Sequence, residues 1–131
     1  MANGKGGMLR LANSDTVEGA FKDGKPSGFC TYSSLIGDVY FGELNHKLEK
    51  HGQGKMQYAN GDAYEGYWAD NMRHHKGRFT YMEGDQFTGF FKNNKMNGYG
   101  TWKYVSEPYL PVLLFLYLSY PCHSLSLSVF L

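Results

Sequence analysis

Apolar and polar residues alternate along most of this chain with a period of two, which is typical of β-strands. Residues 64–69 (Tyr-Glu-Gly-Tyr-Trp-Ala) and 76–81 (Lys-Gly-Arg-Phe-Thr-Tyr) show the pattern most clearly. Nowhere in residues 16–104 do apolar residues recur at spacings of three and four over three turns, so no helix is predicted. We therefore predict an all-β fold, an elongated, twisted antiparallel sheet of consecutive β-hairpins with an irregular apolar C-terminal tail.

The alternating pattern repeats along the chain. Val17, Tyr40, Tyr64 and Phe87 begin successive copies, spaced by 23, 24 and 23 residues, and the extra residue is assigned to 48–51. A fixed period between about 20 and 50 residues indicates a repeat array. The predicted organisation is a partial repeat at 1–14, four repeats at about 15–37, 38–61, 62–84 and 85–104, and a non-repeat tail at 105–131.

Glycines and aromatic residues occupy fixed positions within each copy. The repeat positions are Tyr40, Gly42, Tyr64, Gly66, Trp68, Gly77, Phe87, Gly89, Phe91, Gly98 and Gly100. Glycine inside a strand normally weakens it, so glycines at fixed positions require a packing reason. We predict that a flat ring from an adjacent strand or copy lies over each glycine, where any β-carbon would collide.

Turn-forming residues separate the predicted strands. Asp23-Gly24, Asn71-Met72 and Asn93-Asn94 fall between the halves of a copy, and Gly37-Asp38, Asn60-Gly61-Asp62 and Gly84-Asp85 fall between copies. Such residues reach positive φ at low cost or bond their own backbone, so each strand is expected to run antiparallel to the next.

The pattern Tyr-Glu-Gly-x-Trp, Gly-x-Gly and Asn-Gly-Asp over about residues 15–104 resembles the MORN (membrane occupation and recognition nexus) repeat. The chain departs from this repeat where the family usually has glycine, at Cys30, Lys47, Asn71, His75 and Asn94. The resemblance implies a non-catalytic scaffold or adaptor binding a protein partner along one face, in a ciliary, flagellar or cytoskeletal assembly. The alternatives that it implies are a phosphoinositide-binding membrane-targeting module, or a truncated form of a larger MORN-containing signalling enzyme or exchange factor.

Length, net charge and cysteine content further limit the classes of function that suit the chain. The 131 residues suit one domain, and 13 basic against 12 acidic residues give no overall attraction to nucleic acid. Cys30 and Cys122 form neither a disulfide framework nor a zinc pattern. Together with the lack of a signal-peptide pattern, they favour a reduced, cytoplasmic setting.

No motif in the chain predicts catalysis, a cofactor or a metal. His74 and His75 are adjacent, and adjacent strand residues point to opposite faces, so the pair is not expected to chelate one ion. Cys30 takes the place of a small buried residue rather than of a nucleophile. Residues 3–7 (Asn-Gly-Lys-Gly-Gly) lack the Gly-Lys-Ser/Thr sequence of a P-loop.

The side of the sheet opposite the glycines is the candidate binding surface. Tyr67, Phe90 and also Phe41 and Thr88 are expected on this side. Basic residues concentrate in the third and fourth copies, at Arg73, Lys76, Arg78, Lys92 and Lys95. These cations favour an acidic protein partner or an acidic phospholipid headgroup, and the alternative is a set of ordinary solvated side chains.

After Tyr104 the repeat stops, and no Lys, Arg, Asp or Glu follows Glu107. Three interpretations of residues 105–131 stay open. The tail is a membrane anchor, a hydrophobic strand pair that covers the last edge of the sheet, or translated intron sequence following a splice-donor-like Val105-Ser106. The first would add a tail-mediated membrane contact.

Overall fold

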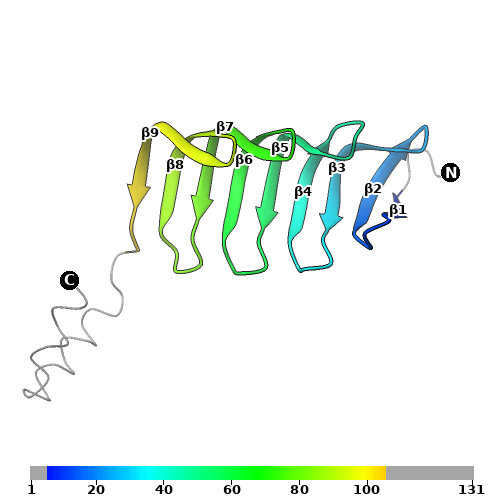
Figure 1. Ribbon diagram of the computed structural model, residues 1–131, viewed down its shortest axis with the longest axis horizontal. Helices are drawn as coiled ribbons and strands as arrows, with labels where there is room; N and C mark the ends of the chain where they lie inside the picture. Colours follow the sequence, from blue (N-terminus) through cyan, green and yellow to red (C-terminus); the bar gives the residue numbers. More distant parts are fainter. Residues whose placement is uncertain (1–5, 106–131) are drawn as a thin grey trace, which may run out of the picture.

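The computed structural model describes residues 6–105, which form one open nine-stranded sheet (Figure 1). The strands are β1 (Gly6–Arg10), β2 (Thr16–Lys22), β3 (Lys25–Ser33), β4 (Val39–Leu44), β5 (Lys50–Gln57), β6 (Ala63–Ala69), β7 (Met72–Thr80), β8 (Gln86–Lys92) and β9 (Lys95–Lys103). They lie in sequence order along the long axis, each antiparallel to its neighbour. The predicted all-β hairpin array is therefore confirmed.

This part of the chain contains no helix long and apolar enough to cross a membrane. Apart from Val105, the three interpretations of the tail fall outside the described residues.

The strand register places the small residues in one row that crosses all nine strands. Successive partners in this row are Gly7, Gly19, Cys30, Gly42, Gly54, Gly66, Gly77, Gly89 and Gly100. A second row, two residues away on each strand and on the same face, runs Leu9, Val17, Tyr32, Tyr40, Met56, Tyr64, Phe79, Phe87 and Trp102. The side chains of this second row form most of the core.

The prediction of a ring over each repeat glycine holds for three glycines of the row and is wrong for Gly98, where a β-carbon would meet nothing within 4 Å. The ring of Tyr40 covers Gly54 on the adjacent strand, that of Tyr64 covers Gly77, and that of Phe87 covers Gly100. The hydroxyls of Tyr40 and Tyr64 donate to backbone carbonyls of their own strands, at 2.7 and 2.9 Å. A β-carbon on any of these three glycines would overlap the ring above it. Ring and bare backbone are therefore one packing unit within each of these hairpins.

Edge-to-face contacts join one copy to the next. Trp68 packs edge-to-face between Tyr40 and Tyr64, with ring centroids 5.5 and 5.0 Å away. Phe91 packs in the same way between Tyr64 and Phe87, at 5.1 and 5.6 Å. The Trp68 indole also donates to the carbonyl of Gly54 at 3.1 Å. Such contacts contribute about 0.5–1.5 kcal/mol each beyond the area they bury, so the copies stabilise one another.

Aspartates connect the turns between copies. Asp15, Asp38, Asp62 and Asp85 each accept a hydrogen bond from a backbone N–H 20 or 21 residues further on, at Leu35, Ala59, Met82 and Val105, over 2.8–3.0 Å. A hydrogen bond to a charged group contributes about 1.5–3 kcal/mol to stability. These bonds therefore explain why aspartate occupies this position in each turn. The bonds to Tyr32 and Leu35 also hold the pKa of Asp15 below its usual value.

Two-residue turns join the strands of three hairpins, with positive φ at both residues. They are Asp23-Gly24, Asp70-Asn71 and Asn93-Asn94. The predicted turn Asn71-Met72 is wrong by one residue, because Met72 begins β7 and pairs with Ala69. In the second copy the extra residue lengthens the turn, which Asn45 and Glu49 close, and the positive φ falls on Leu48 instead of Lys47.

A bulge lies just before the glycine-row residue in the second strand of each hairpin, in β3, β5, β7 and β9. Three residues there oppose one residue of the first strand, and one residue of each bulge has positive φ. Glycine takes this place at Gly28, Gly52 and Gly98, with φ of 72, 73 and 79°, whereas the third copy has His75 at 54°. A β-carbon makes this conformation unfavourable, so His75 holds a strained backbone.

We expect Gly77→Ala to lower the free energy of unfolding by about 2–3 kcal/mol, because the new methyl group overlaps the ring of Tyr64. Urea denaturation would measure the loss. Gly6→Ala is the matched control, since a β-carbon there meets nothing within 4 Å. Equal effects of the two substitutions would contradict the ring-over-glycine packing.

We expect His75→Gly to raise the free energy of unfolding by about 1 kcal/mol, because glycine adopts positive φ without the β-carbon clash. Thermal and urea denaturation of the variant would measure the gain. His74→Gly, at the neighbouring strand residue, should lower stability instead. A loss of stability in His75→Gly would show that the imidazole contacts outweigh the backbone strain.

Candidate functional site

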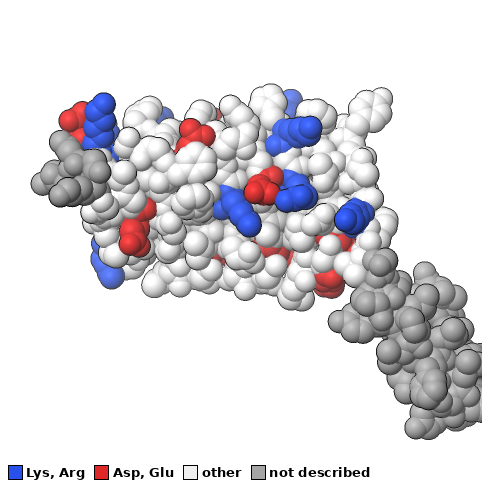
Figure 2. Space-filling model, turned by 180° about the vertical axis from the view of Figure 1, so that it is seen from behind, with Lys and Arg blue, Asp and Glu red and all other residues white. Residues whose placement is uncertain are grey.

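The two faces of the sheet differ in what they present to solvent. The core face buries the large rings and the glycine row. The opposite side, here called the exposed face, carries side chains at alternate positions of the same strands. Figure 2 shows basic side chains gathered around an acidic one near the middle of this side. The exposed face is therefore the surface that the fold leaves available for binding.

From β4 to β7, rings and cations alternate from strand to strand on the exposed face. Phe41 on β4 and Tyr67 on β6 are exposed rings, and they alternate with the exposed cations Lys55 on β5 and Lys76 and Arg78 on β7. Strand β8 carries both kinds of side chain, at Phe90 and Lys92. Tyr67 and Phe90 keep 41% and 49% of their surface accessible, so they offer apolar area that the packing of the sheet does not use.

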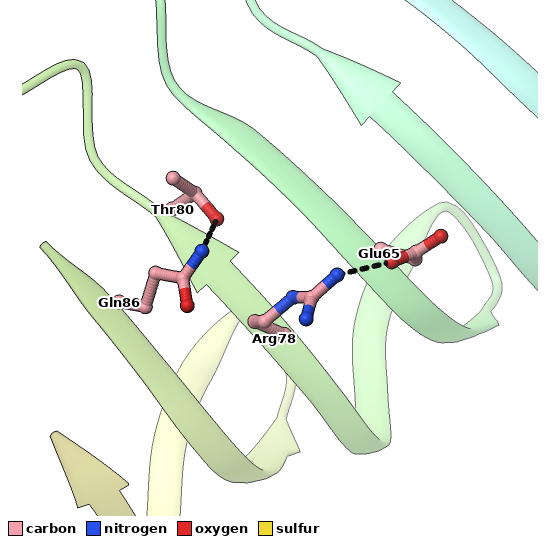
Figure 3. Close-up of polar contacts among 4 residues, drawn as sticks. All are labelled: Glu65, Arg78, Thr80 and Gln86. Carbon is pink, nitrogen blue, oxygen red and sulfur yellow. Dashed lines mark hydrogen bonds and ion pairs between the residues drawn. The ribbon is translucent and has the colours of Figure 1, made fainter. Parts of the chain in front are cut away.

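An ion pair neutralises part of this positive surface. Arg78 lies opposite Glu65 in the register and contacts its carboxylate at 2.8 Å, with both side chains about half exposed (Figure 3). Thr80 and Gln86 form a neighbouring cross-strand hydrogen bond of 3.4 Å in the same view. An exposed ion pair contributes about 0–1 kcal/mol, so Arg78 can exchange Glu65 for another carboxylate at low cost.

Two shallow hollows lie side by side on the exposed face and share His75. The first is lined by residues of β5 to β8, including Glu65, Tyr67, Lys76, Arg78 and the backbone of Gly66 and Gly77. The second is lined by residues of β7 to β9, including His74, Phe90, Lys92 and Tyr99. The two adjoining hollows, whose linings extend from β5 to β9, are together called the groove below.

The rings of His74 and His75 contact each other, with centroids 4.6 Å apart. The expectation that adjacent histidines point to opposite faces is wrong here, because the bulge interrupts the strand alternation at His75. His75 also meets the ring of Tyr67 edge-to-face, with centroids 5.9 Å apart. Within residues 6–105, no three His, Cys, Asp or Glu side chains lie together as metal ligands.

Arg73 lies apart from the other cations of the candidate surface. Its guanidinium is within 6 Å of the centroids of four rings, those of Tyr58, Tyr64, Phe79 and Phe91. It donates to the Tyr58 hydroxyl and to the carbonyl of Asn94, both at 2.6 Å. Arg73 therefore stabilises the core face by cation–π contacts and is not placed to meet a partner on the exposed face.

Lys50 is the counterpart of Arg73 in the second copy, and its ammonium lies within 6 Å of the centroids of Tyr32, Tyr40 and Trp68. Burial lowers the pKa of Lys50 and raises that of Tyr64 to about 12. The sequence analysis missed this role, although the 23-residue spacing of Lys50 and Arg73 was a signal for it.

Three further residues that the sequence singled out, Lys92, Lys95 and Cys30, lie in different parts of the structure. Lys92 lines the second hollow, whereas its cross-strand partner Lys95 lies beyond the groove, next to the turn Asn93-Asn94. Cys30 is fully buried in the glycine row, and this burial raises the pKa of its thiol. A buried thiol of raised pKa is a poor nucleophile, which agrees with its packing role.

Comparison with protein families matches the MORN repeat at residues 18–39, 49–63, 64–86 and 87–107, together more than half of the chain. The shortest match falls in the second copy, where the turn is longer than in the others. No curated protein matches the chain. The family match and the hairpin array agree, and the chain belongs to the MORN-repeat family.

Proposed function

We propose that this chain is a non-catalytic adaptor that binds a protein partner along the exposed face of its sheet. The observation that carries the proposal is that exposed rings and cations alternate from β4 to β7 and lie together on β8, on the side that the core does not use. MORN repeats are generally non-catalytic and often bind proteins or membranes, so the proposal specifies one of the two kinds of partner typical of the family.

The chemistry of the exposed face favours a protein. Protein interfaces are enriched in aromatic residues and arginine, and a few such side chains supply most of the binding energy. Tyr67 and Phe90 supply rings whose positions are fixed by strands, and Lys76 lies opposite Phe90 in the register. Rigid side chains lose little entropy on binding, so a sheet surface suits this role.

A second candidate function is docking to a membrane that contains phosphoinositides. It is favoured by the exposed cations Lys55, Lys76 and Lys92, which would attract anionic headgroups. A membrane does not require rings at a two-strand spacing, so this function accounts for less of the face. Vesicle flotation with and without phosphatidylinositol 4,5-bisphosphate would test it.

The cellular setting is proposed from the family alone. Adaptors of this family serve in cilia, flagella and cytoskeletal structures, and we propose the same cytoplasmic settings for this chain. Related arrays also stand beside enzymatic domains, so the same face would serve equally well in a truncated form or a module of a larger signalling protein.

We expect the double charge reversal Lys76→Glu with Arg78→Glu to abolish capture of the partner by the tagged full chain, because both cations flank the groove. Chemical crosslinking followed by mass spectrometry would identify the captured protein and locate its crosslinks. Lys22→Glu with Lys25→Glu, a cross-strand pair at the first hairpin, is the matched control and should leave capture unchanged. Crosslinks confined to the core face, or equal loss in the control, would overturn the proposal.

A further inference from the structure

We propose that the groove binds an acidic, proline-rich segment in the polyproline II conformation. The inference rests on the proposed function and names the chemistry of the partner. It is argued from the spacing of the rings, the lining of the groove and the sign of its charge.

The spacing of the exposed rings matches the pitch of polyproline II. Tyr67 lies on β6 and Phe90 on β8, and two strand spacings amount to about 9.6 Å. A polyproline II helix repeats every three residues, or about 9.3 Å, so every third side chain points the same way. An α-helix repeats at about 5.4 Å and an extended strand at about 6.7 Å, and neither fits this spacing.

The lining of the groove suits proline rings. Tyr67 borders the first hollow, Phe90 and Tyr99 border the second, and His75 contributes to both. Aromatic-lined grooves bind polyproline II segments because the ligand is already ordered and loses little entropy on binding. His75, whose backbone has positive φ, lies edge-to-face against Tyr67 and lines both hollows.

The charge of the groove selects an acidic segment. Lys76, Arg78 and Lys92 line the two hollows, and Glu65 is the single acidic residue among their linings in the described part of the chain. Since Glu65 is already paired with Arg78, the groove presents a net positive surface. Carboxylates three residues apart in the ligand would meet Lys55 on β5 and Lys76 on β7, which lie two strands apart.

The test uses the full chain and a fluorescein-labelled peptide, (Pro-Pro-Glu)5, with binding measured by fluorescence anisotropy. We expect saturable binding that weakens with added salt. Two control peptides test separately whether binding depends on the three-residue period of the ligand and on the sign of its charge. One contains ten prolines followed by five glutamates, and the other is (Pro-Pro-Lys)5, and both should bind at least ten-fold more weakly.

Variants assign the binding to the groove. Tyr67→Ala and Phe90→Ala should each weaken binding at least five-fold, and Phe29→Ala, an exposed ring of β3 outside the groove, should not. His75→Gly should weaken binding while it raises the free energy of unfolding, and urea denaturation of the same variant separates loss of the imidazole from loss of the fold. Circular dichroism of each variant would confirm that the sheet is intact.

Several outcomes would overturn the inference. Equal binding of the periodic and block peptides would show that the three-residue period of the ligand does not matter. An equal loss of affinity in Phe29→Ala would show that the peptide does not bind in the groove. Binding of phosphoinositide vesicles with the same residue dependence, without peptide binding, would assign the groove to membranes instead. If the peptide fails while the double charge reversal still abolishes partner capture, this inference is wrong and the proposed function stands.

Discussion

The structure depends on one contact, an aromatic ring laid flat over a glycine of the neighbouring strand. Tyr40, Tyr64 and Phe87 each make this contact within their own hairpin, and no side chain can take the place of the covered glycine without overlapping the ring. Because this packing uses one face of the sheet, the other face is free of it. Trp68 and Phe91 then connect one hairpin to the next through edge-to-face contacts.

Because one face of the sheet supplies the packing and the other does not, a small repeat can carry a varied binding surface. Stability resides in the glycine row, the rings above it and the aspartates of the turns. The residues that point the other way, such as Tyr67 and Lys76, are constrained mainly by their strand geometry. A repeat array can therefore change its surface residues from copy to copy without losing its fold.

Much of this architecture is readable from the sequence, because its causes are local and periodic. The alternation of residues predicts the strands, and the fixed places of Gly54 and Gly77 predict the rings above them.

The bulge at His75 was not predictable from alternation, since a bulge changes which way a side chain points. The role of Arg73 was missed for a related reason. A cation in a sequence reads as solvent-exposed, and only the fold shows the rings of Tyr64 and Phe79 around it. The two-residue period of the strands predicted which side of the sheet carries Tyr67 and Phe90. The groove was not predictable in this way, because its shape depends on the bulges.

The aspartate bonds between successive turns have a mechanical consequence. Each joins a turn to the backbone 20 or 21 residues further on, and the strands lie across the long axis of the molecule (Figure 1). Tension between the two ends would therefore act along the inter-strand hydrogen bonds, and the aspartate bonds between successive turns would share that load. An array of this kind yields first at the junction with the weakest contacts, and it then lengthens one hairpin at a time.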